Sequence, residues 1–165
     1  MNLNPEVSRL DSGQSLAALP RMGWFYEIQL EAPAEAVIDK IKVAVHQIVS
    51  ASAESWPSDD EWRRRLPPWL LKVLPVMSRE ECQQLMVETP KNLWHTLPWE
   101  YSSWLDAMKL RNWRWWGYSV RGNQLDLVLE IVSEPAGLEA FEVIVKAAGG
   151  VVASDRRMTA RDQSA

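Results

Sequence analysis

The chain has 165 residues, with 18 Lys and Arg against 22 Asp and Glu and a formal net charge of −4. This length fits one domain that buries about 70 % of its unfolded surface, and 47 % hydrophobic with 24 % charged residues excludes a disordered or fibrous chain. One Cys and two His exclude a disulfide framework and leave little for a zinc site, whereas ten Trp, against three Tyr and two Phe, are unusual.

The N-terminal residues MNLNPEVSRLDSGQSLAALP have neither a basic start nor a continuous apolar core, so no secretory signal is expected. No stretch approaches the roughly 20 apolar residues that cross a bilayer, and the single Cys82 fits a reducing compartment. The sequence therefore predicts a soluble, cytoplasmic protein. We expect flexible segments at 1–20 and 155–165, which are polar and lack periodicity, and a single domain over 21–154.

The first predicted elements are a strand and a helix. Residues 24–30 alternate, with Trp24, Tyr26 and Ile28 on one face, which is typical of a strand. Pro33 begins the helix at a position where a missing N–H costs nothing. The apolar stripe of this helix has the spacing of an α-helix and comprises Val37, Ile41, Ala44, Val45 and Ile48.

Residues 56–110 are rich in Trp and Pro, which predicts a helical insert made of short, interrupted helices. Ser58 with Glu61, and Ser78 with Glu81, have the spacing of capping boxes and indicate two helix starts. Pro98 indicates a third. The face of that third helix is formed by Tyr101, Trp104, Leu105 and Met108.

Two strands and a helix follow the insert. WRWWGYSV at 113–120 and LDLVLEIV at 125–132 are separated by a turn at Gly122-Asn123, which predicts a hairpin. A second amphipathic helix then ends at Gly149-Gly150, and VVA at 151–153 predicts a short edge strand. The apolar face of this second helix comprises Leu138, Phe141, Ile144, Val145 and Ala148.

Without the insert, the order of elements is βαββαβ. This order predicts an α+β fold of the ferredoxin-like, split type, in which an antiparallel sheet carries two helices on one face. The Trp- and Pro-rich helical insertion at 56–110 follows the first helix.

No catalytic constellation is evident, so we expect no enzyme activity, no cofactor and no metal site. Cys82 and His95 have no spacing that indicates a nucleophilic pair. Asp59, Asp60 and Glu61 stand at a predicted helix N-terminus, where negative charge stabilises the helix dipole. A small enzyme of unrecognised type stays open as a rival and would require a deep pocket with convergent polar groups.

RNWRWWGYSVR at 111–121 interleaves basic and aromatic side chains, the combination that binds single-stranded nucleic acid. The alternative reading, a module for single-stranded nucleic acid or a small ligand, would use Arg111, Arg114, Trp116 and Arg121. The acidic balance of the chain, and the expectation that one Trp face of the strand is core, argue against nucleic acid as the partner.

The surplus of Trp has two interpretations. Most of these side chains are expected to pack in the core and to hold the insert against the sheet. Those left at the surface would supply large, rigid contact area, because Trp is the residue type most enriched at binding hot spots.

WLDAMKLRNWRWWGYSV at 104–120 and GLEAFEVIVKAAGG at 137–150 together resemble a loose group of small, uncharacterised bacterial proteins with a W-x-W-W strand and a C-terminal helix ending in Ala-Gly. The resemblance covers about the last third of the chain, and it carries over no catalytic residues. It implies a bacterial protein similar in size and acidity to immunity proteins that neutralise cognate toxins.

The leading hypothesis is therefore a non-enzymatic immunity protein that occludes the active site of a toxin. An acidic inhibitor suits a basic target such as a nuclease, because opposite fields speed encounter. The expected steering groups are Asp59, Asp60, Glu61, Glu130 and Glu134. The expected anchors are Trp62, Trp69 and Trp116.

Overall fold

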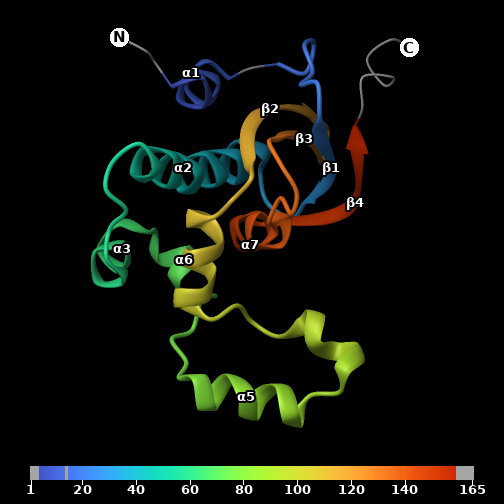
Figure 1. Cartoon of the computed structure of the whole chain (residues 1–165). Helices are drawn as coiled ribbons and strands as arrows, with labels where there is room; N and C mark the ends of the chain where they lie inside the picture. The colour runs from blue at the N-terminus through green and yellow to red at the C-terminus, as the bar shows by residue number, and fades with distance from the viewer. Residues whose placement is uncertain (1–3, 14, 159–165) are drawn as a thin grey trace.

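A computed structural model describes residues 4–13 and 15–158 of the chain. In chain order the elements are α1 (Pro5–Ser12), β1 (Gly23–Leu30), α2 (Ala34–Ser52), α3 (Asp59–Arg65), α4 (Pro68–Leu71), α5 (Arg79–Glu88), the 3-10 helix η1 (Lys91–Thr96), α6 (Tyr101–Lys109), β2 (Trp113–Arg121), β3 (Gln124–Ile131), α7 (Leu138–Ala148) and β4 (Gly150–Met158). Figure 1 shows their arrangement.

The four strands form one sheet in the order β2-β3-β1-β4, and every neighbouring pair is antiparallel. The chain is therefore an α+β protein with a four-stranded antiparallel sheet, as the sequence predicts. The predicted hairpin is confirmed between β2 and β3, where Gly122 adopts a φ of 57°, a left-handed conformation that glycine accepts without strain.

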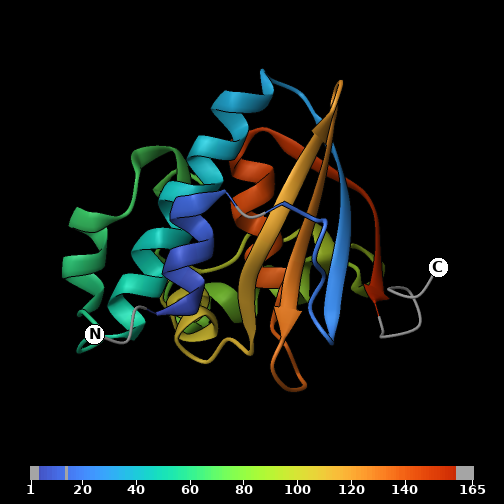
Figure 2. The same cartoon turned by 90° about the horizontal axis from the view of Figure 1, so that it is seen from above.

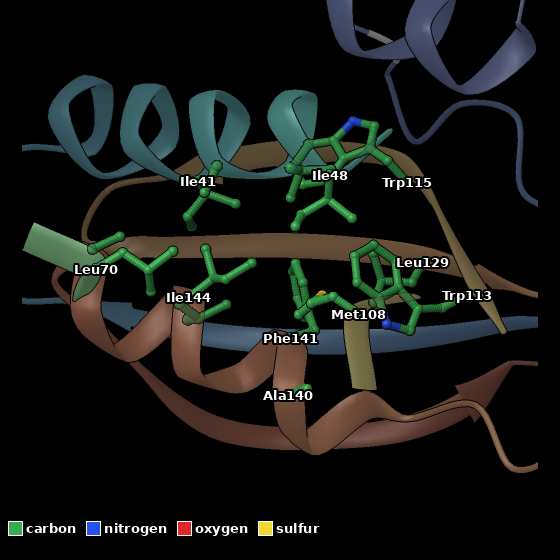
Figure 3. Close-up of a cluster of buried hydrophobic side chains, with 14 of the residues drawn as sticks. Ile41, Ile48, Leu70, Met108, Trp113, Trp115, Leu129, Ala140, Phe141 and Ile144 are labelled. Atoms are coloured by element: carbon green, nitrogen blue, oxygen red, sulfur yellow. The ribbon is translucent and has the colours of Figure 1, made fainter. Parts of the chain in front are cut away.

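The hydrophobic core lies between the sheet and the helices α2 and α7. Figure 3 shows Ile41 and Ile48 of α2 pointing toward Phe141 and Ile144 of α7. Both predicted apolar stripes are confirmed, because all five residues of the α2 stripe are fully buried and four of the five on α7 are buried too. Residues spaced at a period of about 3.6 thus lie on the faces that the sheet requires.

The other face of the sheet is partly covered by the chain that follows α1. Figure 2 shows this segment crossing β2 and β3 on its way to β1. The indole N–H of Trp116 donates to the carbonyl of Ala18 at 2.8 Å. A bulge between Trp115 and Gly117 shifts the register of β2 by one residue. Tyr118 consequently lies opposite Leu127 on the core face, whereas simple alternation places it with Trp116 on the other face.

The N-terminal segment, expected to be a loosely held end, contains α1. Asn4 caps this helix and Pro5 begins it. Leu10 is buried in the core, and the Glu6 carboxylate is 3 % exposed and paired with Arg111. The sequence does not indicate α1, because a helix of 8 mostly polar residues, little more than two turns, shows no clear stripe. Its partner Arg111 also lies about 100 residues further along the chain.

The insert consists of short helices, as predicted, and α3, α5 and α6 have side-chain N-caps. The Ser58 hydroxyl accepts from the Glu61 N–H, and Ser78 with Glu81 forms a complete capping box. The third helix begins at Tyr101 rather than at Pro98, because the Glu100 carboxylate accepts from the first free N–H groups of α6. The last strand also runs further than predicted, from Gly150 to Met158.

In the part of the chain that the structure describes, every helix is too short or too polar to cross a membrane.

Candidate functional site

Residues 75–100 form a lobe that projects from the rest of the fold beneath α6 and α7 (Figure 1). Neither α5 nor η1 has a single buried residue. The lobe is closed on itself by Trp94, whose indole N–H donates to the carbonyls of Met86 and Thr89 at 3.2 and 3.0 Å. This lobe is therefore held by its own contacts and caps rather than by burial in the core.

A cavity of about 1230 Å³ lies between the lobe and the body of the protein. Its walls come from three places: the end of α4 and the residues after it, the inner face of the lobe, and the outer face of α7. The apolar and aromatic side chains of the lining are Trp69, Val73, Met77, Leu85, Met86, Trp94, Leu97, Pro98, Trp99, Val143 and Ala147. An apolar lining with a few polar groups is typical of a binding site.

Two carboxylates of α7, Glu139 and Glu142, form part of the α7 wall. The phenol of Tyr26 donates to Glu142 at 3.1 Å. Burial raises the pKa of the Glu142 carboxyl above its ordinary value, the hydrogen bond from Tyr26 lowers it, and the charges of Asp155 and Glu139 raise it further. Burial, with a smaller effect of Glu142, also raises the pKa of Tyr26, which keeps this phenol a donor.

The remaining charged groups of the lining are Glu100, Lys72, Lys146 and His95. The Glu100 carboxylate is occupied as the cap of α6, where it accepts from Ser102 and Ser103. A cation of α2 lies near the aromatic side of the lining: the Lys40 ammonium is 5.7 Å from the ring centroid of Trp69. The cavity thus has an apolar interior with charged groups on its wall, and Glu139, Glu142 and Lys146 share one face of α7.

Cys82 and His95 also lie on this wall. Among the residues that the structure describes, no hydrogen bond joins the two side chains, and no group of three or more His, Cys, Asp or Glu is placed to hold a metal ion.

The expected steering residues do not form one surface. Asp59, Asp60 and Glu61 lie on α3, whereas Glu130 and Glu134 lie on and after β3, a strand of the sheet (Figure 1). Most of these carboxylates have partners within the chain. Asp59 accepts from Ser102, Glu61 pairs with Arg65, Glu130 lies 3.9 Å from Arg9, and Glu134 pairs with Arg157.

The three expected Trp anchors have different surroundings. Trp62 is 0 % exposed and packs against Trp56, so it is a core residue rather than a surface anchor. Trp116 is half-buried beneath the Arg9 guanidinium, 4.8 Å from its ring centroid. Trp69 alone of the three lines the cavity.

The expected nucleic-acid patch is not assembled either. Arg111 is 9 % exposed, pairs with Glu6 and stacks over Trp113, so it is unavailable to a phosphate. Arg121 pairs with Asp126 at 2.9 Å. Arg114 is exposed on β2, but Trp116 beside it is already covered.

Sequence reasoning missed the α7 side of the cavity. Glu139, Glu142 and Lys146 occupy the polar face of an amphipathic helix, which is typical of a solvated surface. On α5, Cys82, Leu85 and Met86 have the spacing of a packed face, which predicts burial. No pattern within either helix indicates that these two faces lie opposite each other across an unfilled space.

Comparisons of this chain with protein-family models, with curated proteins and with solved structures find no significant match.

Proposed function

We propose that this chain is a non-enzymatic binding protein of the immunity type, which neutralises a cognate toxin by occupying the surface that the toxin needs for activity. The proposal rests on one observation. The helices of the lobe have no buried residue, and the cavity between the lobe and α7 is lined by apolar and aromatic side chains. An unfilled apolar surface of this size costs free energy in water, and a bound partner would recover it.

The proposed docking surface is the cavity between the lobe and α7, not the set of residues expected from the sequence. Trp69 remains an anchor, and Trp94 and Trp99 join it. Large rigid aromatic side chains around a cavity are the usual hot spots of an interface. The net charge of −4 favours encounter with a basic toxin. We keep a cytoplasmic location as part of this proposal.

We also propose that the fold belongs to the split βαββαβ, ferredoxin-like class. The strand order and the placement of α2 and α7 on one face support this assignment. The lobe would then belong to an insertion between the first helix and the second strand of that class.

The test is co-expression of the tagged chain with the product of the neighbouring open reading frame, followed by capture and by a growth assay. A stoichiometric complex that survives high salt, together with growth rescue, is the expected result. Recovery of the chain alone, or a complex that gives no rescue, would contradict the proposal.

Two adjacent residues of α5 provide a matched pair of variants. Met86 is 41 % exposed and lines the cavity, whereas Val87 is 83 % exposed and does not. Met86→Glu is expected to weaken the complex at least about tenfold, the effect of losing one anchor of about 1.4 kcal/mol. Val87→Glu is expected to leave it unchanged. If the two variants weakened the complex equally, the cavity would not be part of the interface.

A further inference from the structure

We infer that the cavity between the lobe and α7 receives an amphipathic helix of the partner, whose apolar face carries a Lys or Arg side chain that reaches Glu139 and Glu142. This inference rests on the proposed function, and it names the chemistry of the partner at that site. The structure supports it through the volume of the cavity, its walls and its charge.

The volume fits a helix. Small-molecule sites measure about 300–1,000 Å³, and the cavity, at about 1230 Å³, is larger. A helix about 10 Å across rises about 1.5 Å per residue, so a segment of roughly ten residues has about this volume. The α5 wall has 10 residues and is accordingly about 15 Å long, which matches three turns of such an occupant.

The walls present helix-packing surfaces. Leu85 and Met86 of α5 face the cavity from one side, and Val143 and Ala147 of α7, one turn apart, face it from another. A helix that lies between two helices packs apolar residues into both grooves. Met77 and Met86 add flexible side chains that adapt to the shape of an incoming apolar face.

The two carboxylates on the α7 wall favour a cationic group on the occupant. Glu139 and Glu142 are one turn apart on α7, and no ion pair of either is found among the described residues. Asp155 adds a third nearby negative charge. A half-buried carboxylate beside like charges is stabilised by a positively charged group that enters its surroundings. Lys146 lies one turn beyond Glu142 on the same face of α7, and Lys72 lies just after α4. Both cations favour an acidic residue further along the same occupant.

The test uses three labelled peptides of 14 residues, acetylated and amidated, and fluorescence anisotropy with the full chain. The first has Leu at positions i, i+3, i+4 and i+7 with Lys elsewhere, which gives an apolar helix face. The second keeps the Leu positions and replaces Lys by Glu. The third has the composition of the first with its four Leu at every second position, which gives no apolar helix face.

We expect the Leu/Lys helix to bind at least about tenfold more tightly than the other two peptides. In the Glu139→Gln/Glu142→Gln double variant this affinity is expected to fall about tenfold, as the loss of charge-assisted contacts predicts. The matched control, Glu35→Gln/Glu54→Gln, changes the net charge equally at the two ends of α2, away from the cavity, and is expected to change the affinity less than twofold.

Four results would overturn the inference, three from the peptide measurements and one from the toxin complex. The first is equal binding of the alternating Leu/Lys peptide, which indicates attraction by charge alone. The second is an equal loss in the two double variants. The third is saturable binding of tetraphenylphosphonium in the cavity without binding of the helix, which indicates a small-molecule site. A toxin complex that tolerates Glu139→Gln/Glu142→Gln would also overturn it while leaving the proposed function standing. Peptide binding by a chain that captures no toxin would overturn only the proposed function.

Discussion

Glu6 and Arg111, which are 105 residues apart in the chain, form a two-point ion pair with nitrogen–oxygen distances of 3.0 and 2.8 Å. Both side chains are withdrawn from water, at 3 % and 9 % exposure. Glu6 Oε2, which accepts from Arg111 at 3.0 Å, also accepts the backbone N–H of Trp115 at 2.8 Å. This contact ties α1 to the start of β2 and takes Arg111 out of any surface function.

Glu6→Ala is expected to lower the free energy of unfolding by about 3–5 kcal/mol, because it leaves the Arg111 charge buried without a partner. Urea unfolding followed by circular dichroism measures the change. Asp11→Ala, on the exposed side of the same helix, is the control and should change stability by less than about 0.5 kcal/mol. A loss of under about 1 kcal/mol for Glu6→Ala would mean that α1 is not held by this pair.

Glu142→Gln is expected to stabilise the protein at neutral pH. The pKa of Glu142 is raised in the folded state, so the stability linked to its proton is present below the ordinary value of 4.5 and is lost as the pH rises through the raised pKa. Gln keeps an oxygen for the Tyr26 phenol without the charge. Unfolding measured between about pH 4 and pH 8 should show the variant more stable at the upper end, with the difference vanishing at the lower end. A difference independent of pH would contradict this account, and Glu54→Gln serves as the exposed control.

Ser78→Ala and Ser58→Ala remove equivalent helix caps in different surroundings. Each cap stabilises its helix by about 1 kcal/mol. Because α3 buries Trp62 and α5 buries nothing, Ser58→Ala should lower global stability, whereas Ser78→Ala should leave it unchanged. Hydrogen exchange of the α5 amides should become about fivefold faster in Ser78→Ala, since these amides exchange by local opening. Equal effects of both variants on global unfolding would show that the lobe unfolds together with the core.

Trp104→Phe is expected to lower the free energy of unfolding by about 2–3 kcal/mol. Its indole N–H donates to the carbonyl of Ala140 on α7 at 2.9 Å, in fully buried surroundings. The variant removes this buried hydrogen bond, which the Ala140 carbonyl accepts in addition to its bond within α7, and leaves part of the indole volume empty. Trp99→Phe, at a half-buried position on the cavity wall, should cost less than about 1 kcal/mol by the same urea measurement. Similar losses at both positions would place Trp99 in the core.

Most elements of the fold could be predicted because their signals are local. The stripe on α2, the capping box at Ser78 and the Gly122 turn each depend on residues within a few positions of one another. The helix α1 and the far half of β4 could not, because polar residues dominate both segments. Simple alternation along β2 also places Tyr118 on the wrong face of the sheet, because a bulge is decided by the pairing of two strands.

The candidate site divides in the same way. By itself the sequence determined that an insert rich in Trp and Pro interrupts the α+β pattern, that its helices are short with capping signals at their starts, and that Trp69 lies within it. Only the tertiary structure decided that Trp62 is buried, that Arg111 is paired with Glu6, and that the polar face of α7 and the helix α5 line the same cavity. Periodicity and capping are properties of a few consecutive residues, whereas burial, ion pairing and an unfilled space depend on segments that meet only when the whole chain has folded.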